Sequence, residues 1–372
     1  SGEEAILSEK QQDLLLREFD PQPALVTEDT TPERARFPVI DAHTHIGAWN
    51  WDSPIGMPMT PSDEWPIEDL EATLAMWDQI NVCSVVNLDG GWGDALLREI
   101  EHYKEPYPDR FFIYAWVDWS EVGQASNFGE KWARELERAV AAGAQGLKVF
   151  KSLGLVYRDE SGQLIMPDDE RLDPVWAMAG ELGIPVVIHS ADPVAFFDPL
   201  DRYNERWEEL YEHPDWHFYG DEYPSFITPI EAQLRVVEKH PHTTFQSAHI
   251  MSYAENLDYV ARALDRYPNL NVDITERISE LGRQPYSARE FLITYADRVL
   301  FGSDAVVPDP DFYRTQFRFL ETDDEYFEYG PRNQGNWRIY GVYLPDDVLR
   351  KIYYENALRL IPGTEGIDIE TS

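Results

Sequence analysis

The chain of 372 residues contains one cysteine, Cys83, and this excludes an internal disulfide. Lysine is also scarce, with 7 Lys against 24 Arg. No run of 18 or more apolar residues occurs, so no helix is expected to span a membrane. The apolar content of 43% is still enough for a sizeable core, which indicates a globular protein of one large or two ordinary domains.

The formal net charge is −38, and acidic residues are spread along the chain. A surface of this sign repels nucleic acid and anionic membranes, so neither is an expected partner. A small-molecule substrate is expected, and a homo-oligomer stays open. A dense acidic surface with little lysine is typical of adaptation to high salt, where screening quiets the repulsion. We therefore hypothesise a halophilic protein, with an ordinary acidic enzyme as the rival reading.

The first ten residues lack the basic start and the apolar core of a secretory signal. A cytoplasmic location is therefore expected. Export stays open, because the chain begins with Ser1-Gly2 rather than Met and looks trimmed.

Three parts are expected: an arm with a short helix over residues 1–36, a main domain over 37–361 and a tail over 362–372. In the main domain, apolar runs alternate with helical patterns. The expected strands are 38–46, 83–89, 111–118, 145–150, 184–190, 243–249, 270–275 and 299–303. The expected helices are 66–80, 94–104, 129–142, 171–182, 229–240, 255–267, 287–296 and 346–358.

Eight such units predict an α/β fold, a parallel (β/α)8 TIM barrel. A doubly wound open sheet is the alternative, weakened because no Gly-x-Gly-x-x-Gly follows the first strand. Three connections, 47–64, 191–228 and 305–345, are too long for simple turns. All three leave carboxyl ends of strands, so they should cover the same face of the barrel.

The first strand ends in Asp41-Ala42-His43-Thr44-His45. Side chains two apart on a strand point to the same side, so His43 and His45 can grip one metal ion. Asp41 should share that face but lie deeper. This carboxyl end is where barrel enzymes keep their chemistry.

Other strand ends repeat the pattern. Strand 184–190 ends near His189, strand 243–249 ends in His249, and Asp304 follows the last strand. A lone histidine at a strand end is usually structural, but three such ends facing His43 and His45 indicate a site. Imidazoles together with a carboxylate suit Zn²⁺, with Mn²⁺ or Fe²⁺ possible, and one ion is favoured over two.

The ordered set resembles the amidohydrolase superfamily, in particular its amidohydrolase-related branch, which includes decarboxylases. The resemblance covers residues 37–361 and includes the Phe301-Gly302-Ser303-Asp304 segment and the closing Tyr354-Glu355-Asn356. It implies that a divalent metal is bound by His43, His45, His189 and Asp304. It also implies that His249 is catalytic in mononuclear members or binds a second metal in binuclear ones.

The chemistry points to a metal-dependent hydrolase. Metal-activated water would attack an ester, lactone or amide carbonyl, Asp304 would act as general base, and His249 would polarise the substrate. A non-oxidative decarboxylase of a small carboxylated compound needs the same metal ligands and is the alternative. A catalytically inactive ligand-binding barrel is the second alternative. We favour the hydrolase because of the breadth of the superfamily.

Three further residues are candidates. Lys148 stands inside an apolar run, Gly146 to Phe150. It either bridges two metals as a carboxylated lysine, as in binuclear amidohydrolases, or meets carboxylates or an anionic substrate. Among the aromatic residues of the long connections, Trp49 is expected to contact substrate. Arg277 either joins a salt-bridged loop or pairs with a substrate carboxylate.

Overall fold

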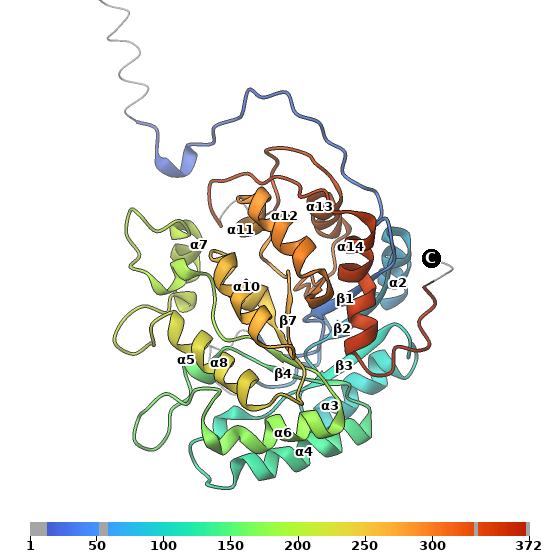
Figure 1. Ribbon diagram of the computed structural model, residues 1–372, viewed down its shortest axis with the longest axis vertical. Coiled ribbons are helices and arrows are strands. Elements are labelled where there is room, and N and C mark those ends of the chain that lie inside the picture. Colours follow the sequence, from blue (N-terminus) through green and yellow to red (C-terminus); the bar gives the residue numbers. More distant parts are fainter. Residues whose placement is uncertain (1–12, 52–58, 331–333, 370–372) are drawn as a thin grey trace, which may run out of the picture.

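The structure is a computed structural model, and it describes residues 13–51, 59–330 and 334–369. Within them, eight parallel strands neighbour one another in sequence order (Figure 1). They are β1 (Val39–Thr44), β2 (Val82–Asn87), β3 (Phe111–Ala115), β4 (Gly146–Val149), β5 (Val186–Ile188), β6 (Phe245–Ser247), β7 (Leu270–Asp273) and β8 (Val299–Leu300). The predicted (β/α)8 barrel is confirmed.

The ring closes between β1 and the segment that follows β8. Ala42 N donates to Phe301 O at 2.9 Å, and Asp304 N donates to His43 O at 2.8 Å. A parallel bridge joins Thr44 and Ala305. These contacts exclude the open-sheet alternative, and they bring Asp304 beside the end of β1 before any side chain is considered.

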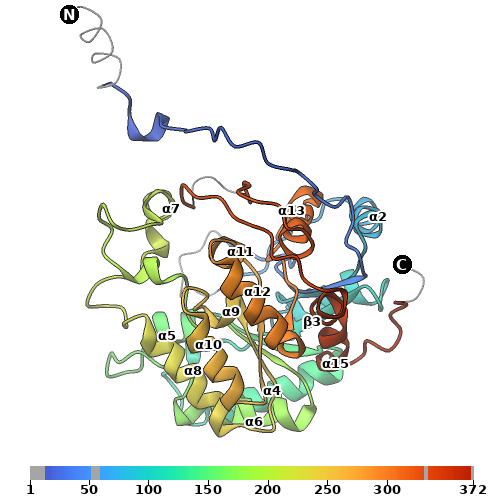
Figure 2. The same ribbon diagram turned by 45° about the horizontal axis from the view of Figure 1, so that its top comes forward.

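Helices cover the outside of the barrel between strands (Figures 1 and 2). They include α2 (Leu70–Ile80), α3 (Gly93–Glu99), α4 (Phe128–Ala142), α6 (Asp173–Leu182), α8 (Ile227–Lys239), α10 (Leu257–Arg266), α12 (Pro285–Thr294), α14 (Asp346–Arg350) and α15 (Asn356–Leu360). Asp69 caps α2 by accepting from Ala72 N, so this helix begins four residues later than expected. Gly183, in the left-handed region with φ 66°, ends α6 as the sequence indicates.

The connections after β4, β5, β6 and β7 carry short helices of their own: α5 (Ser152–Leu155), α7 (Trp207–Glu212), α9 (Ala248–Met251) and α11 (Ile278–Gly282). The connection after β8 also contains α13 (Pro310–Glu321), a helix that is absent from those expected from the sequence. Asp309 caps α13 and Pro310 starts it, a start signal that is readable in the sequence. Residues 52–58 of the first connection lie outside the described residues.

The N-terminal segment is anchored to the connection after β8. Thr30 donates to Asp324 from its N at 2.8 Å and from its Oγ1 at 2.6 Å. Its described part holds one 3-10 turn, η1 (Leu16–Glu18). Figure 2 shows this segment running past α13 towards α7.

Apolar side chains fill the amino-terminal half of the barrel. Ile40, Val86, Phe112, Val187 and Leu300 form a buried cluster with Ala357 and Ile361, which close that end. A second, larger cluster lies between the strands and the helices. The barrel is therefore plugged at one end, and polar side chains that point inward gather at the other end.

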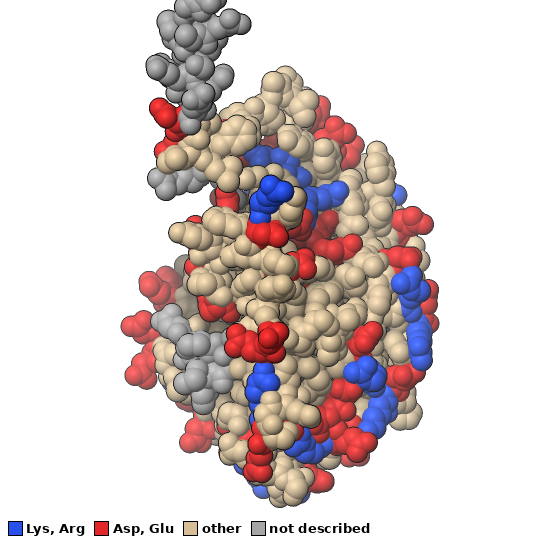
Figure 3. Space-filling view, turned by 90° about the vertical axis from the view of Figure 1, so that its left-hand side faces the viewer, with Lys and Arg blue, Asp and Glu red and all other residues tan. Residues whose placement is uncertain are grey.

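Charged side chains stay on the surface for the most part, and Figure 3 shows Asp and Glu distributed over one face between smaller groups of Lys and Arg. Among the described residues, no helix combines the length and the apolar character needed to cross a bilayer.

Candidate metal centre

The end of β1 and the turn after β8 bring three side chains together. His43 Nε2 and His45 Nε2 lie 3.1 Å and 3.2 Å from the same oxygen, Asp304 Oδ1. One ligand atom from each of these three residues lies within 4.8 Å of the others, a spacing that can hold a metal ion. The structure thus places these three predicted ligands in one group.

Two buried aspartates support the histidines from behind. Asp273 Oδ2 lies 3.0 Å from His43 Nδ1, and Asp89 Oδ1 lies 2.6 Å from His45 Nδ1. Because an ionised carboxylate only accepts, each Nδ1 carries the hydrogen and each neutral ring presents a lone pair at Nε2. A carboxylate behind each ring is the usual support of a histidine that binds metal.

The three ligand atoms are therefore acceptors that face one another. His43 Nε2 is fully buried and, despite its short distance to Asp304, makes no hydrogen bond of acceptable geometry to any residue that the structure describes. Acceptors that converge without a hydrogen between them repel unless a cation lies among them. The donor set fits a divalent metal ion, which accepts imidazole nitrogen and carboxylate oxygen together.

Without a metal, the same arrangement favours a proton. Burial alone would lower the pKa of His45, but the negative charges of Asp89 and Asp304 outweigh it and raise this pKa to about 9. Burial would raise the pKa of Asp304, yet the neighbouring His43 and His45 hold it well below its usual range. A metal ion and a proton compete for these nitrogens.

Asp304 is held in an unusual backbone conformation, with φ at 63°. Asp41 fixes the preceding turn, since its carboxylate accepts from Ser303 N at 3.0 Å and from the Tyr313 hydroxyl at 2.6 Å. The expectation that Asp41 shares the inward face of His43 is wrong. The β1 register is irregular between Asp41 and Thr44, and the Asp41 carboxylate turns towards α13.

The close approach of the two chain segments requires Gly302. A Cβ at this position would lie 2.2 Å from Thr275 Oγ1 and 2.8 Å from His43 Cβ. Any larger residue would push His43 away from Asp304, so the glycine of the Phe301–Asp304 segment serves the site directly.

His189, after β5, lies on the same side of the barrel but outside the group of three. Its ring centroid is 4.4 Å from that of His249, and its Nε2 is 3.3 Å from Asp192 Oδ1. Asp192 also accepts a hydrogen bond from Lys151. Burial lowers the pKa of His189 to about 4, against the opposing effect of Asp192. His189 therefore presents a neutral ring that, like those of His43 and His45, is supported by an aspartate.

His249 follows β6 and lies 5.1 Å from His43 between ring centroids. Its backbone φ is 60°, in the left-handed region. Its Nδ1 lies 2.8 Å from the backbone oxygen of Thr275, so Nδ1 carries the hydrogen and Nε2 carries the lone pair. Burial holds the pKa of His249 well below its usual range, with His189 and Arg277 adding to the effect.

Lys148 is completely buried on β4, and its Nζ has no hydrogen-bond partner in the described part of the chain. This ammonium lies 5.2 Å from the centroid of the Phe150 ring. Burial lowers the pKa of Lys148 to about 8, although Asp304, Asp273 and Asp89 pull it upward. Lys148 therefore sits within the electrostatic reach of the metal-centre carboxylates.

The structure places the two other candidates away from the ligand group. Trp49 is buried, its Nε1 donates to Asp89 O at 2.7 Å, and its ring packs on Trp116 at 4.3 Å. It therefore supports the loop behind His45. Arg277 is also buried, donates to Glu276 O at 2.8 Å and interacts electrostatically with Glu255 and Glu280.

Sequence reasoning missed the supporting residues more than the ligands. Asp89 and Asp273 were not assigned roles, although each follows or ends an apolar strand, and that position was the available signal. Gln246, which donates to Asp273 Oδ2 at 2.8 Å, gave no signal at all. Trp51, whose ring lies 5.5 Å from that of His45, is not among the candidates that the sequence singled out.

Comparison with known proteins supports this description. The sequence model of the amidohydrolase family matches residues 40–363, which contain the barrel except for Val39, the first residue of β1. No protein in the curated set matches the chain significantly.

Three solved structures share the fold at low sequence identity. A 2,6-dihydroxybenzoate decarboxylase complexed with 2,6-dihydroxybenzoate is 16% identical, with a TM-score of 0.54, over 87% of this chain and 99% of that one. A dihydroxybenzoic acid decarboxylase from Polaromonas sp. JS666, with bound manganese and the inhibitor 2-nitroresorcinol, is 16% identical, with a TM-score of 0.53, over 87% and 96%. A 5-carboxyvanillate decarboxylase from Sphingomonas paucimobilis is 14% identical, with a TM-score of 0.51, over 87% and 98%.

Proposed function

The chain belongs to the amidohydrolase family, and we propose that it is a metal-dependent hydrolase of a small ester, lactone or amide. The substrate carbonyl would lie at the carboxyl end of the barrel, beside Asp304. This side chain is 28% exposed, unlike the fully buried His43, so substrate and water can reach it.

One divalent ion would be held by His43, His45 and Asp304, with His189 as the fourth ligand. Zn²⁺ suits this donor set best, and Mn²⁺ or Fe²⁺ are accepted by the same atoms. The manganese bound in the Polaromonas structure supports including Mn²⁺ among the candidate ions. When bound, the ion supplies Lewis acidity and lowers the pKa of a coordinated water towards 7.

The protein side chains then move the protons. Asp304 takes a proton from the attacking water and returns it to the leaving group. His249 Nδ1 donates its hydrogen to the backbone oxygen of Thr275, so Nε2 is the ring atom that would face the substrate. It polarises the carbonyl oxygen only after it has accepted a proton there, because a neutral ring in this tautomer has no second hydrogen to donate.

The observation that carries the proposal is that Asp304 Oδ1 and both histidine Nε2 atoms converge as acceptors. Hydrolysis needs a base beside the metal, and both Asp304 and His249 present acceptor atoms to the site. This arrangement favours hydrolysis.

Decarboxylation is the second candidate, because the three similar structures above bear the names of decarboxylases. It needs a proton to be delivered to the carbon that loses CO₂, so Asp304 or His249 would have to be protonated first. The same metal ligands serve both reactions.

A substrate panel on Zn- and Mn-loaded protein separates the two. Esters, lactones and amides are tested beside hydroxybenzoates, with acid release and CO₂ release measured separately. We expect acid release that a chelator abolishes. CO₂ release from any substrate at a comparable rate would contradict the hydrolase proposal and support decarboxylation.

His43→Ala serves as the matched variant. Its metal content by elemental analysis should fall at least about tenfold, the scale known even for residues that only support a ligand. Unchanged metal content in a folded variant would refute the assignment of the metal centre.

A further inference from the structure

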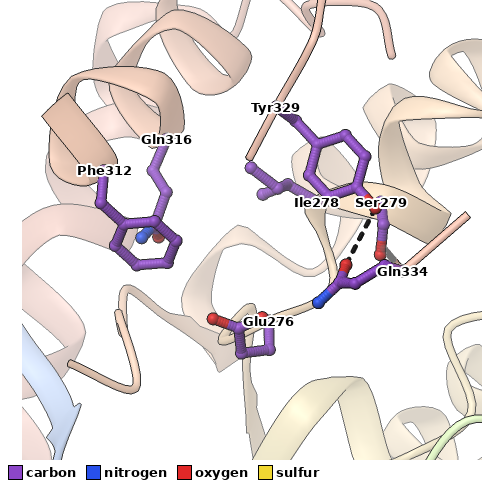
Figure 4. Close-up of a pocket in the computed structure, with 7 residues that line it drawn as sticks. All are labelled: Glu276, Ile278, Ser279, Phe312, Gln316, Tyr329 and Gln334. Carbon is purple, nitrogen blue, oxygen red and sulfur yellow. Dashed lines mark hydrogen bonds between the residues drawn. The ribbon is translucent and has the colours of Figure 1, made fainter. Parts of the chain in front are cut away.

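A pocket opens beside the metal centre where the chain leaves β7. Glu276 lies at its base, three residues after Asp273, with φ at 53°. Figure 4 shows Phe312 and Gln316 on one wall and Tyr329, Ser279 and Gln334 on the other. The space in it that a water-sized sphere can occupy is about 10 Å³, which is room for about one hydroxyl group.

A chain of hydrogen bonds orders the wall beside Glu276. Trp337 Nε1 donates to the Tyr329 hydroxyl at 2.8 Å, and this hydroxyl donates to Gln334 Oε1 at 2.8 Å. The Gln334 side chain lies close enough to the Glu276 carboxyl to lower its pKa, and Asp304 lies close enough to raise it.

Gln316, on α13, is 2% exposed, and neither its Nε2 nor its Oε1 has a hydrogen-bond partner within the described residues. A buried amide without partners is costly, because it gives up its bonds to water and gains none. An amide that lines a pocket and has both its donor and its acceptor free is suited to a ligand.

We propose that this pocket binds a neutral, hydroxylated part of the substrate, through Glu276 and the Gln316 amide. The inference rests on the proposed function, since it takes the metal centre as the place where the same substrate reacts. It extends that function by naming the chemistry of the group that lies away from the metal.

The donor and acceptor inventory selects hydroxyl groups. A hydroxyl donates to the Glu276 carboxyl or to Gln316 Oε1, and it accepts from Gln316 Nε2. A carboxylate only accepts, leaves Gln316 Oε1 unpaired and faces the charge of Glu276. An ammonium only donates and leaves Gln316 Nε2 unpaired. The rings of Phe312 and Tyr329 add apolar surface for the carbon skeleton.

The charge of the pocket agrees with this choice. Its described lining residues include one carboxyl and no Lys or Arg. Burial raises the pKa of Glu276 to about 7, and the negative charge of Asp304 adds to the shift. A second carboxylate would enter unfavourably.

Four γ-lactones that share a ring and differ in the kind of polar group attached to it test the proposal. They are D-ribono-1,4-lactone with hydroxyls, γ-butyrolactone with none, homoserine lactone with an ammonium and 5-oxotetrahydrofuran-2-carboxylate with a carboxylate. Dissociation constants are measured calorimetrically on Zn-loaded wild type, Gln316→Met and Gln124→Met. Gln124 is an exposed control. KM and kcat are measured for any lactone that is hydrolysed.

We expect the wild type to bind ribonolactone at least about tenfold more tightly than each of the others, roughly the effect of one hydrogen bond. Gln316→Met should remove this preference without weakening γ-butyrolactone, whereas Gln124→Met should change neither. Tightest binding of the carboxylate or the ammonium lactone overturns the proposal. So does undetectable ribonolactone binding, or equal weakening of all lactones by Gln316→Met.

The same data separate this inference from the proposed function. If no lactone is hydrolysed but the preference for hydroxyls and its loss in Gln316→Met remain, the hydrolase proposal fails and the subsite stands. If all lactones are hydrolysed with equal KM in wild type and variant, the subsite fails and the hydrolase stands.

Discussion

Asp273 Oδ2 lies 3.0 Å from His43 Nδ1, and both side chains are fully buried. Asp273 ends β7 and His43 ends β1, so the pair connects strands from different parts of the barrel. Gln246 and the backbone N of His249 also donate to Asp273, at 2.8 Å and 3.0 Å. One carboxylate therefore contacts both His43, a candidate metal ligand, and the backbone of His249, for which we propose a catalytic role.

Replacing Asp273 should weaken metal binding, although Asp273 is not itself a proposed ligand. Asp273→Asn replaces the carboxylate by an amide. The amide accepts less strongly from His43 Nδ1, so the tautomer with the lone pair at Nε2 is less favoured. We expect metal affinity to fall about 10- to 100-fold, as is usual for such supporting residues. Competition with a chelator of known affinity measures it. Asp258→Asn, on the exposed surface, is the control, and equal affinity in both variants would show that Asp273 has no such role.

Lys148 distinguishes one metal ion from two. We favour one ion, with Lys148 balancing the carboxylates, so elemental analysis should find about one ion per chain in both wild type and Lys148→Met. Activity should fall in the variant, because the carboxylates lose the positive charge among them. Two ions in the wild type and one in Lys148→Met would establish a bridging lysine in place of our assignment.

Glu99 should make the protein less stable as pH rises. Burial raises its pKa to about 8, although Ala48 N and Asn87 donate hydrogen bonds to it. In the unfolded chain the group titrates near 4.5. Between these values the folded protein binds more protons than the unfolded chain, so stability is lost as pH rises through this window.

Glu99→Gln removes that loss. The melting temperature of the variant relative to wild type should therefore be higher at about pH 8.5 than at about pH 5.5, by roughly 2 °C or more. Glu101→Gln, its exposed neighbour on the same helical stretch, should show the same difference at both values. A Glu99→Gln difference that does not grow with pH contradicts the assignment.

We also propose that the acidic surface is an adaptation to high salt. With a net charge of −38, repulsion between surface carboxylates is screened to about 3 Å at 1 M salt, against about 10 Å at 0.1 M. The melting temperature should therefore rise from about 0.1 M to about 1 M KCl. A melting temperature that stays constant or falls with KCl concentration would contradict this proposal and indicate an ordinary acidic enzyme.

The barrel and its main ligands were readable because they depend on local rules. Strand ends were marked by apolar runs that stop at His43-Thr44-His45, His249 and Ser303-Asp304, and parallel strands bring such ends to one face. The glycine of Phe301–Asp304 was visible as part of a motif, but the close approach to His43 that requires it was not.

The sequence by itself determined the eight alternating units, the parallel barrel and the side of it on which the histidines and Asp304 meet, because hydrophobic periodicity and chain direction decide those features. Only the tertiary structure decided which atoms support them. The pairing of Asp273 with His43, the turn of Asp41 towards α13 and the position of the buried Gln316 amide at the wall of a pocket depend on residues far apart in the chain. Their contacts follow from packing and strand register, which no local pattern records.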